Sequence, residues 1–256
     1  MLLTIDVGNT TTGIAVFCEG RLVFINKLMT PDEVSRYYLK SLVKKKYRLE
    51  VKDIIVSSVV PFVDESLRMS IKEYFGKDAI FIDHNTPDQV GLKLKIDIPE
   101  ELGADRIADT IGALHFFEPP FIIIDSGTAT TFDVVSKDLE YLGGCIFPGI
   151  ELSINSLAQH AAKLGRVHFR VPESIMGTNT ESHIITGIYH CYVGGLSYMI
   201  KEYKKIIGNN AKVIATGGLV RYFESKIKGI DLFEPNLIYY GLMKIYDMIK
   251  VRNKKI

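Results

Sequence analysis

Short apolar runs bounded by turn residues recur through the first third of the chain. Such runs are typical of strands, and the Glu19-Gly20 pair between the second and third runs predicts a hairpin turn. Amphipathic stretches between the later runs predict two helices, the first with Thr30 as its N-cap and Glu33 closing a capping box. The predicted strands are Leu2–Val7, Gly13–Cys18, Leu22–Leu28, Asp53–Ser58 and Ala79–Ile82, and the predicted helices are Pro31 to about Lys45 and Asp64–Phe75.

The second half of the chain repeats this plan after a long polar segment, His84–Leu102, which predicts a functional or mobile loop. Each half has the order β-β-β-α-β-α-β of a ribonuclease-H-like unit, and the alternation indicates the α/β class. We expect two duplicated halves, residues 1–118 and 119–256, meeting near Pro119. The later strands are predicted at Phe121–Asp125, Ala129–Val135, Leu139–Cys145 and Lys212–Ala215. The later helices are predicted at Gly103–Phe117, after Pro148-Gly149, and at about Thr180–Ile207 and Asn236–Val251.

Two turns after predicted strands share Asp, Gly, Thr and Thr at the same offsets. They are Asp6-Val7-Gly8-Asn9-Thr10-Thr11-Thr12, followed by Gly13, and Asp125-Ser126-Gly127-Thr128-Ala129-Thr130-Thr131. Glycine lets a ligand approach the backbone, and successive N–H groups form a concavity that binds anions. An Asp in such a turn either ligates a cation beside the phosphates or only caps the turn. The repetition of the pattern favours a polyphosphate held between two halves.

Three further segments carry candidate chemistry. Gly103-Ala104-Asp105-Arg106 opens a predicted helix, where Asp105 is either an ordinary helix-start charge or a base that accepts a hydroxyl proton. Arg106 is then a surface neighbour or an anchor for a substrate anion. Thr180 opens the long helix and is either part of its cap or an anion contact. Gly217-Gly218 follows a strand and either admits a nucleoside or serves tight packing.

Composition excludes several classes of protein. The net charge of +1 over 256 residues gives no basic footprint for nucleic acid. The three cysteines have no paired spacing, so we expect reduced thiols and neither a disulfide framework nor a zinc site. No signal peptide and no apolar run of the roughly 20 residues that span a bilayer is evident, and we expect a cytoplasmic protein.

Taken together, these motifs resemble the type III pantothenate kinases of the acetate and sugar kinase/Hsp70/actin superfamily. The resemblance runs nearly end to end and includes Asp6–Thr10, Ser57–Pro61, Gly103–Arg106, Asp125–Thr130, Gly143-Gly144 through Pro148-Gly149, Gly177–Thr180 and Gly217-Gly218. It implies ATP-dependent phosphorylation of pantothenate to 4'-phosphopantothenate, the first step of coenzyme A biosynthesis. It also implies Mg²⁺ with ATP, a monovalent cation (K⁺ or NH₄⁺) and a homodimer.

The resemblance also implies roles for single residues. The segment Asp6 to Gly13 (Asp6, Val7, Gly8, Asn9, Thr10, Thr11, Thr12 and Gly13) would cradle the phosphates of ATP, and Thr128 would contact ATP. Asp125 would hold the monovalent cation. Gly103, Ala104, Asp105, Arg106 and Thr180 would bind pantothenate, with Asp105 as the proton acceptor.

The chain departs from the family pattern in one place. Family members usually carry a tyrosine seven positions before the glycine of the Gly-Ala-Asp-Arg motif, followed by Asn-Pro, whereas this chain reads Ile96-Asp97-Ile98-Pro99. The substitution is expected to affect affinity more than reaction type. Two other functions stay open: another kinase or phosphohydrolase of the superfamily that acts on a sugar or a polyphosphate, and a non-catalytic nucleotide-binding regulator. An intact Asp105 argues against the regulator.

Overall fold

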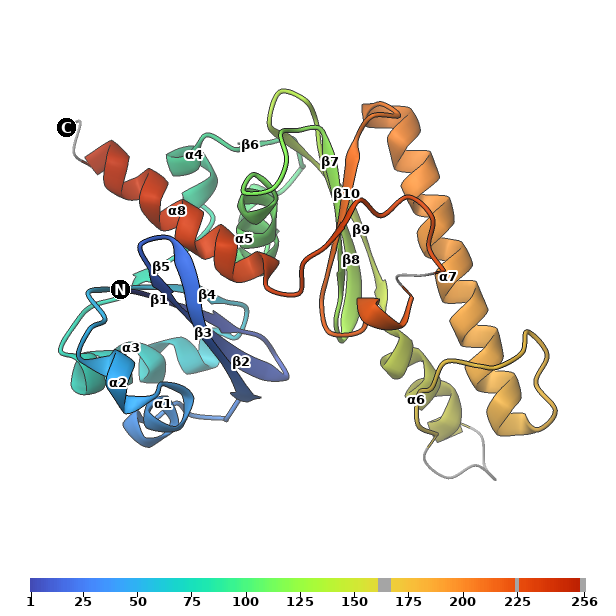
Figure 1. Cartoon of the computed structure of the whole chain (residues 1–256), viewed down its shortest axis with the longest axis horizontal. Helices are drawn as coiled ribbons and strands as arrows, with labels where there is room; N and C mark the ends of the chain where they lie inside the picture. The colour runs from blue at the N-terminus through green and yellow to red at the C-terminus, as the bar shows by residue number, and fades with distance from the viewer. Residues whose placement is uncertain (161–166, 224–225, 254–256) are drawn as a thin grey trace. The chain divides into compact units, whose positions relative to one another are not determined.

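The computed structural model describes residues 1–160, 167–223 and 226–253, which belong to two compact units (Figure 1). The first unit contains Met1–Phe116 and the chain from Asn236 onward, and the second contains Phe117–Pro235. The chain first passes from one unit to the other between Phe116 and Phe117, close to the boundary expected near Pro119. The terminal helix α8 (Leu237–Asn253) belongs to the first unit, whereas we had expected it in the second half.

The first unit is built on a mixed five-stranded sheet in the order β3-β2-β1-β4-β5. Central β1 (Leu2–Val7) pairs antiparallel with β2 (Thr11–Cys18) and parallel with β4 (Asp53–Ser58), which sets Asp6 between Gly13 and Ser57. Both faces of β1 are buried along most of its length, as is typical of a central strand. The outer strands are β3 (Arg21–Met29) and β5 (Ile80–Phe81).

Helices cover both faces of this sheet. Leu3, Ile5 and Val7 alternate along β1 and pack with buried residues of α1 (Arg36–Leu42) and α3 (Pro61–Phe75) in one core. On the other face, α5 (Ala104–Ala113) and α8 approach each other through glycines. A Cβ on Gly112 would lie 2.6 Å from the Leu237 carbonyl oxygen, so only glycine allows these two helices to pack this closely. The short helix α2 spans Lys45–Arg48.

Two predictions for the first unit were wrong. The helix expected from Pro31 begins at Arg36 with Ser35 as its N-cap, because Thr30 is hydrogen-bonded back to the first loop through its backbone N–H and its hydroxyl. The segment His84–Leu102 is also not a plain loop. It contains α4 (Thr86–Val90), β6 (Lys93–Leu94) and a 3₁₀ turn, η1 (Pro99–Glu101).

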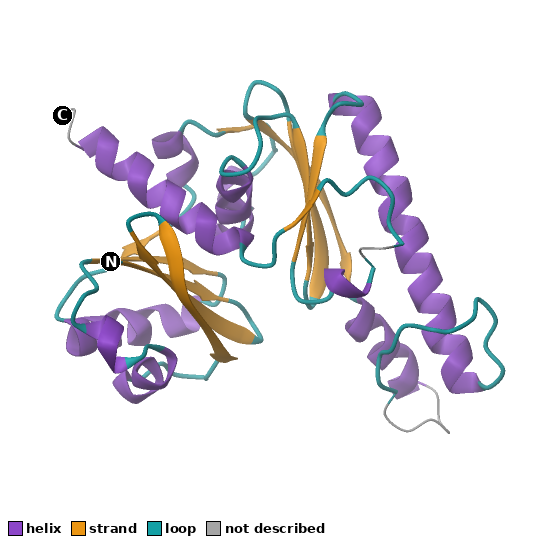
Figure 2. Cartoon of the chain, in the orientation of Figure 1, coloured by secondary structure: helices purple, strands orange, loops and turns teal. Residues whose placement is uncertain are grey.

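The second unit repeats the sheet plan, with strands in the order β11-β10-β7-β8-β9. Figure 2 draws the strands in orange and the helices in purple. Central β7 (Phe121–Ser126) pairs antiparallel with β8 (Ala129–Val135) and parallel with β10 (Lys212–Thr216). The other strands are β9 (Glu140–Pro148) and β11 (Leu232–Phe233), and a short 3₁₀ turn, η2, spans Val220–Tyr222. β1 and β7 thus occupy equivalent positions in the two units, which agrees with the predicted duplication.

The long helix α7 (Thr180–Ile207), predicted at these bounds, packs on this second sheet, and α6 (Ile150–His160) begins directly after Gly149. The buried face of α7 includes Ile185, Tyr189 and Tyr192, which share a core with Ile122 and Phe132 of the sheet. The sequence also predicts an irregular stretch at Gly165–Asn179, of which residues 165 and 166 lie outside the described residues. Within the described residues, no helix is long and apolar enough to cross a membrane.

Candidate active site

The first predicted phosphate loop is a tight turn between β1 and β2. The Gly8 N–H donates to the Thr11 carbonyl (3.0 Å), and Asn9, Thr10 and Thr11 are exposed. The loop is held from below by Thr30, whose hydroxyl donates to the Gly8 carbonyl at 2.6 Å and lies 3.1 Å from the Thr12 hydroxyl. Thr12 and Gly13 are buried, so they support the loop from inside the fold.

Asp6 is half-buried at the end of β1 and lies between two unusual neighbours. Gly13 is directly opposite on β2, and an added Cβ there would overlap the hydroxyl of Tyr239, which comes from α8. Ser57 is opposite on β4. Tyr239 and Ser57 are both fully buried, and neither hydroxyl has a hydrogen-bond partner in the structure.

Asp105 lies in the first turn of α5 with its carboxylate folded back over the helix start. Its Oδ1 accepts the Arg106 N–H at 2.8 Å, and a Cβ on Gly103 would clash with the same oxygen. Burial raises the pKa of Asp105 above its usual value, and this outweighs the lowering by the Arg106 N–H and charge. The result is a carboxylate that is a stronger base than one in water.

The first loop and Asp105 belong to the same edge of the first sheet. The N–H of Val59, the residue after β4, donates to the Val7 carbonyl at the end of β1 (3.0 Å). A Cβ on Gly103 would lie 3.7 Å from Val59 Cγ1, so the start of α5 is beside the ends of these two parallel strands. Ligands of α/β sheets bind outside the carboxyl ends of parallel strands, which is where these groups lie.

The second loop, in the second unit, is held by two glycines that permit close approach. Gly217 has φ +90° and follows β10, and a Cβ there would lie 2.5 Å from Asp125 Oδ1. The Gly149 N–H donates to the Thr128 carbonyl at 3.0 Å. The turn at Gly217 therefore packs against the Asp125 carboxylate, and Thr128 is exposed at the tip of the loop.

The base of the second loop is tied to α7 through one tyrosine. The Tyr192 hydroxyl lies 2.7 Å from the Ser126 hydroxyl and also contacts the Thr130 hydroxyl. All three residues are buried. Ser126 is thus engaged in a structural contact.

Thr180 is exposed at the first position of α7. Asn179 is the N-cap, with a capping box to Ser182, so the cap does not need the Thr180 side chain. Twelve residues separate Thr180 from Tyr192, which places it about 18 Å along the helix from the contact with the second loop. The second unit therefore does not bring Thr180 to that loop through α7.

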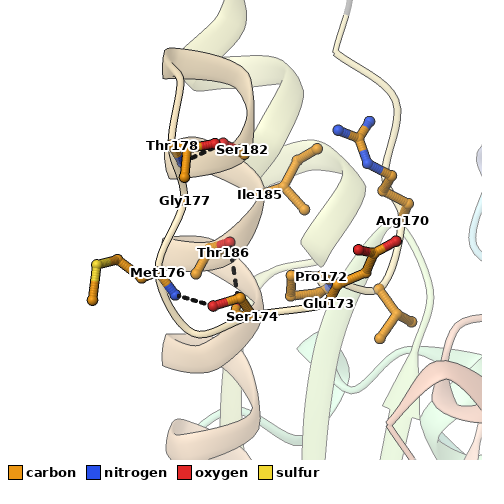
Figure 3. Close-up of a pocket in the computed structure, with 11 residues that line it drawn as sticks. Arg170, Pro172, Glu173, Ser174, Met176, Gly177, Thr178, Ser182, Ile185 and Thr186 are labelled. Carbon is orange, nitrogen blue, oxygen red and sulfur yellow. Dashed lines mark hydrogen bonds between the residues drawn. The ribbon is translucent and has the colours of Figure 1, made fainter.

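A pocket of about 320 Å³ lies between the start of α7 and the segment that precedes it (Figure 3). Figure 3 shows that several polar groups around it bond to one another. The Thr178 N–H donates to Ser182 Oγ (2.9 Å), and the Met176 N–H donates to Ser174 Oγ (3.1 Å). These contacts hold the segment against the helix, and we assign the pocket no ligand.

Sequence reasoning missed three residues around the loops: Tyr239, Tyr192 and Thr30 in its role under the first loop. Each is distant in sequence from the loop that it touches and belongs to an ordinary amphipathic or polar stretch, so no local signal marked it. Among the residues that the structure describes, no group of three His, Cys, Asp or Glu side chains could hold a metal ion.

Comparison with known families identifies the chain. The family model described as type III pantothenate kinase matches residues 2–202. This chain belongs to the type III pantothenate kinase family. It is therefore an ATP-binding transferase, a kinase that transfers phosphate to pantothenate in coenzyme A biosynthesis, and a kinase of this type uses ATP with a divalent metal ion.

Solved structures place the fold of this pantothenate kinase among actin-like ATPases and sugar kinases. A Campylobacter jejuni protein described as belonging to the Baf family of transcriptional activators is 20% identical, with a TM-score of 0.56 over 99% of this chain and 100% of that one. The ROK hexokinase of Thermus thermophilus is 14% identical (TM-score 0.52, 100% and 99% covered). MreB5 of Spiroplasma citri is 13% identical (TM-score 0.53, 99% and 98% covered). At these identities, the likeness shows the fold alone.

Proposed function

We propose that Asp105 is the general base that accepts the proton of the primary hydroxyl of pantothenate as that hydroxyl attacks the γ-phosphate of ATP. The observation that supports this is the position of Asp105 at the start of α5, beside the ends of β1 and β4, with burial raising its pKa. A raised pKa brings a carboxyl closer to the working pH and makes it a better proton acceptor.

The reaction is an in-line phosphoryl transfer. A bond forms between the pantothenate oxygen and the γ-phosphorus, the bond from that phosphorus to the bridging oxygen of ADP breaks, and the hydroxyl proton passes to Asp105. In this proposal, the backbone of Gly8 to Thr11 and the exposed Thr128 bind the phosphates. Asp6 would hold the divalent ion, which neutralises the charge of the phosphates when bound. Its surroundings fit a hard cation because they offer carboxylate and hydroxyl oxygens.

A monovalent cation (K⁺ or NH₄⁺) would be held at Asp125. The fit rests on Asp125 Oδ1, an anionic oxygen of the kind that ligates hard cations, and Gly217 beside it carries no side chain. Such an ion would add positive charge near the phosphates, and Asp125 itself would serve only to position it. The Gly217-Gly218 turn, next to that carboxylate, is our candidate for the wall on the nucleoside side.

Arg106 is proposed to bind the carboxylate of pantothenate, since a guanidinium pairs well with a planar anion. Gly103 and Ala104 would shape the same site, because the folded-back Asp105 carboxylate lies against Gly103. Thr180 is proposed as a further pantothenate contact.

We also propose a homodimer and a cytoplasmic location. These two proposals rest on the family resemblance and on the metabolic role of the family.

The test is ADP release from Mg·ATP with and without pantothenate, in K⁺ and in Na⁺ buffer. We expect pantothenate-dependent turnover in K⁺, and a loss of at least 100-fold in kcat for Asp105→Asn, since general bases contribute about 10²–10⁴-fold. Asp88→Asn, in the exposed first turn of α4, is the matched control and should keep full activity. Full activity of Asp105→Asn would refute the base. ATP binding without turnover in the wild type would favour a nucleotide-binding regulator.

A further inference from the structure

Two orphan hydroxyls flank the same carboxylate in the first unit. Tyr239 and Ser57 have no exposed surface, and neither Tyr239 Oη nor Ser57 Oγ has a hydrogen-bond partner in the structure. A buried hydroxyl without a partner is costly and is therefore rare in native proteins. Two of them around one residue call for a functional explanation.

The register of the sheet places both hydroxyls on the side of Asp6. Asp6 is paired with Ser57 of β4 on one side and with Gly13 of β2 on the other. Residues opposite one another on neighbouring strands project to the same face of a sheet. The Asp6 and Ser57 side chains therefore share the face on which α8 packs, and the Tyr239 hydroxyl occupies the space over Gly13 on that face.

Gly13 is the residue that lets the Tyr239 hydroxyl reach this position. A Cβ at Gly13 would overlap Tyr239 Oη and would lie 3.2 Å from its Cζ. The backbone of Gly13 has no positive φ, so its conformation does not by itself require glycine. An added Cβ would also lie 3.1 Å from Cγ of the exposed Lys27, but its shortest contact is with the Tyr239 hydroxyl, so the glycine makes room for that hydroxyl.

Tyr239 and Ser57 can each donate a hydrogen bond through the hydroxyl to an oxygen anion. The carboxylate that the sheet register places beside them is that of Asp6.

We propose that Tyr239 and Ser57 are positioning residues that orient the Asp6 carboxylate toward the divalent ion and phosphates of the bound nucleotide. The inference rests on the nucleotide site of the proposed function. Neither residue touches the transferred phosphoryl group. They act through Asp6, from α8 on one side and from β4 on the other, and Gly13 makes the space that Tyr239 needs.

The test compares Tyr239→Phe and Ser57→Ala with the wild type and with Tyr246→Phe. Tyr246 lies on the same helix, but its hydroxyl interacts with Lys250 of that helix and with Asp53 at the start of β4, away from the loop. Binding of ADP is titrated at a series of Mg²⁺ concentrations, and kcat and KM for pantothenate are measured in parallel. We expect Tyr239→Phe to need about tenfold more Mg²⁺ for half-maximal ADP binding, because the variant lacks the hydroxyl that would donate to the charged site once the ion and nucleotide are bound. KM for pantothenate should not change.

Urea unfolding in EDTA gives a second readout that needs neither metal nor activity. There, Tyr239→Phe should be as stable as the wild type or more stable, because an orphan hydroxyl is removed. Gly13→Ala should be destabilised, and Tyr239→Phe in the same chain should restore much of that loss. Unchanged Mg²⁺ dependence in both single variants, with altered stability alone, would overturn the proposal. If the wild type binds Mg·ADP but does not phosphorylate pantothenate, the proposed function fails and the binding comparison still decides this inference.

Discussion

A methyl group added at Gly217, by replacing it with alanine, should disturb the second loop more than a methyl group added at Gly218 in the same turn. Gly217 has φ +90°, a conformation that side chains rarely adopt, and the new Cβ would lie 2.5 Å from Asp125 Oδ1 and 2.6 Å from the Ser126 carbonyl carbon. The neighbouring Gly218 has no positive φ, and nothing lies within 4 Å of an added Cβ there. The two substitutions are chemically identical and differ only in their surroundings.

The expected cost has two parts. A left-handed conformation costs an L residue about 1–2 kcal/mol. Relieving contacts this short requires the backbone or the Asp125 side chain to move, and overpacking of this kind costs about 1–3 kcal/mol. Together, we expect Gly217→Ala to lower the free energy of unfolding by about 2–5 kcal/mol, a large share of the roughly 5–15 kcal/mol typical of a folded protein.

Urea unfolding of the two variants beside the wild type measures this difference. We expect Gly218→Ala to stay within about 0.5 kcal/mol of the wild type. Because the displaced carboxylate is the proposed cation ligand, Gly217→Ala should also need more K⁺ for half-maximal turnover. Equal stability of the two variants would refute the steric reasoning. Lower stability with unchanged K⁺ dependence would separate Asp125 from the cation.

Other outcomes are expected for the caps, the buried hydroxyls and Asp105. Tyr192→Phe should lower the free energy of unfolding by about 1–3 kcal/mol in urea, because the buried Ser126 hydroxyl loses its partner. Asn179→Ala should cost about 1 kcal/mol through loss of the α7 cap, whereas Thr180→Ala should leave the melting temperature unchanged and alter only KM for pantothenate. Since burial raises the pKa of Asp105, kcat/KM should fall with decreasing pH at a pH above the usual carboxyl value of 3.8. The same shift lowers folding stability as the pH rises from the usual carboxyl value through the raised pKa, so the full cost is present at neutral pH and Asp105→Asn should unfold at higher temperature than the wild type there.

Much of the fold could be predicted from the sequence because it depends on local patterns. The strand Leu2–Val7 and the helix Thr180–Ile207 have the bounds that were predicted for them. The prediction of a helix from Pro31 was wrong. A capping box is a local preference, and the long-range hydrogen bonds of Thr30 to the first loop override it. The elements inside His84–Leu102 were missed because they are short and carry little periodicity.

By itself, the sequence determined the two similar Asp-Gly-Thr turns, the Gly-Ala-Asp-Arg helix start and the family, because each depends on residue types at close spacing. Only the tertiary structure decided what surrounds those loops. Tyr239 reaches Gly13, and Tyr192 reaches Ser126, from helices far along the chain. These pairings depend on strand register and helix packing, which no local pattern records. Whether a glycine serves a ligand or makes room for a neighbouring side chain is therefore readable only from the folded chain.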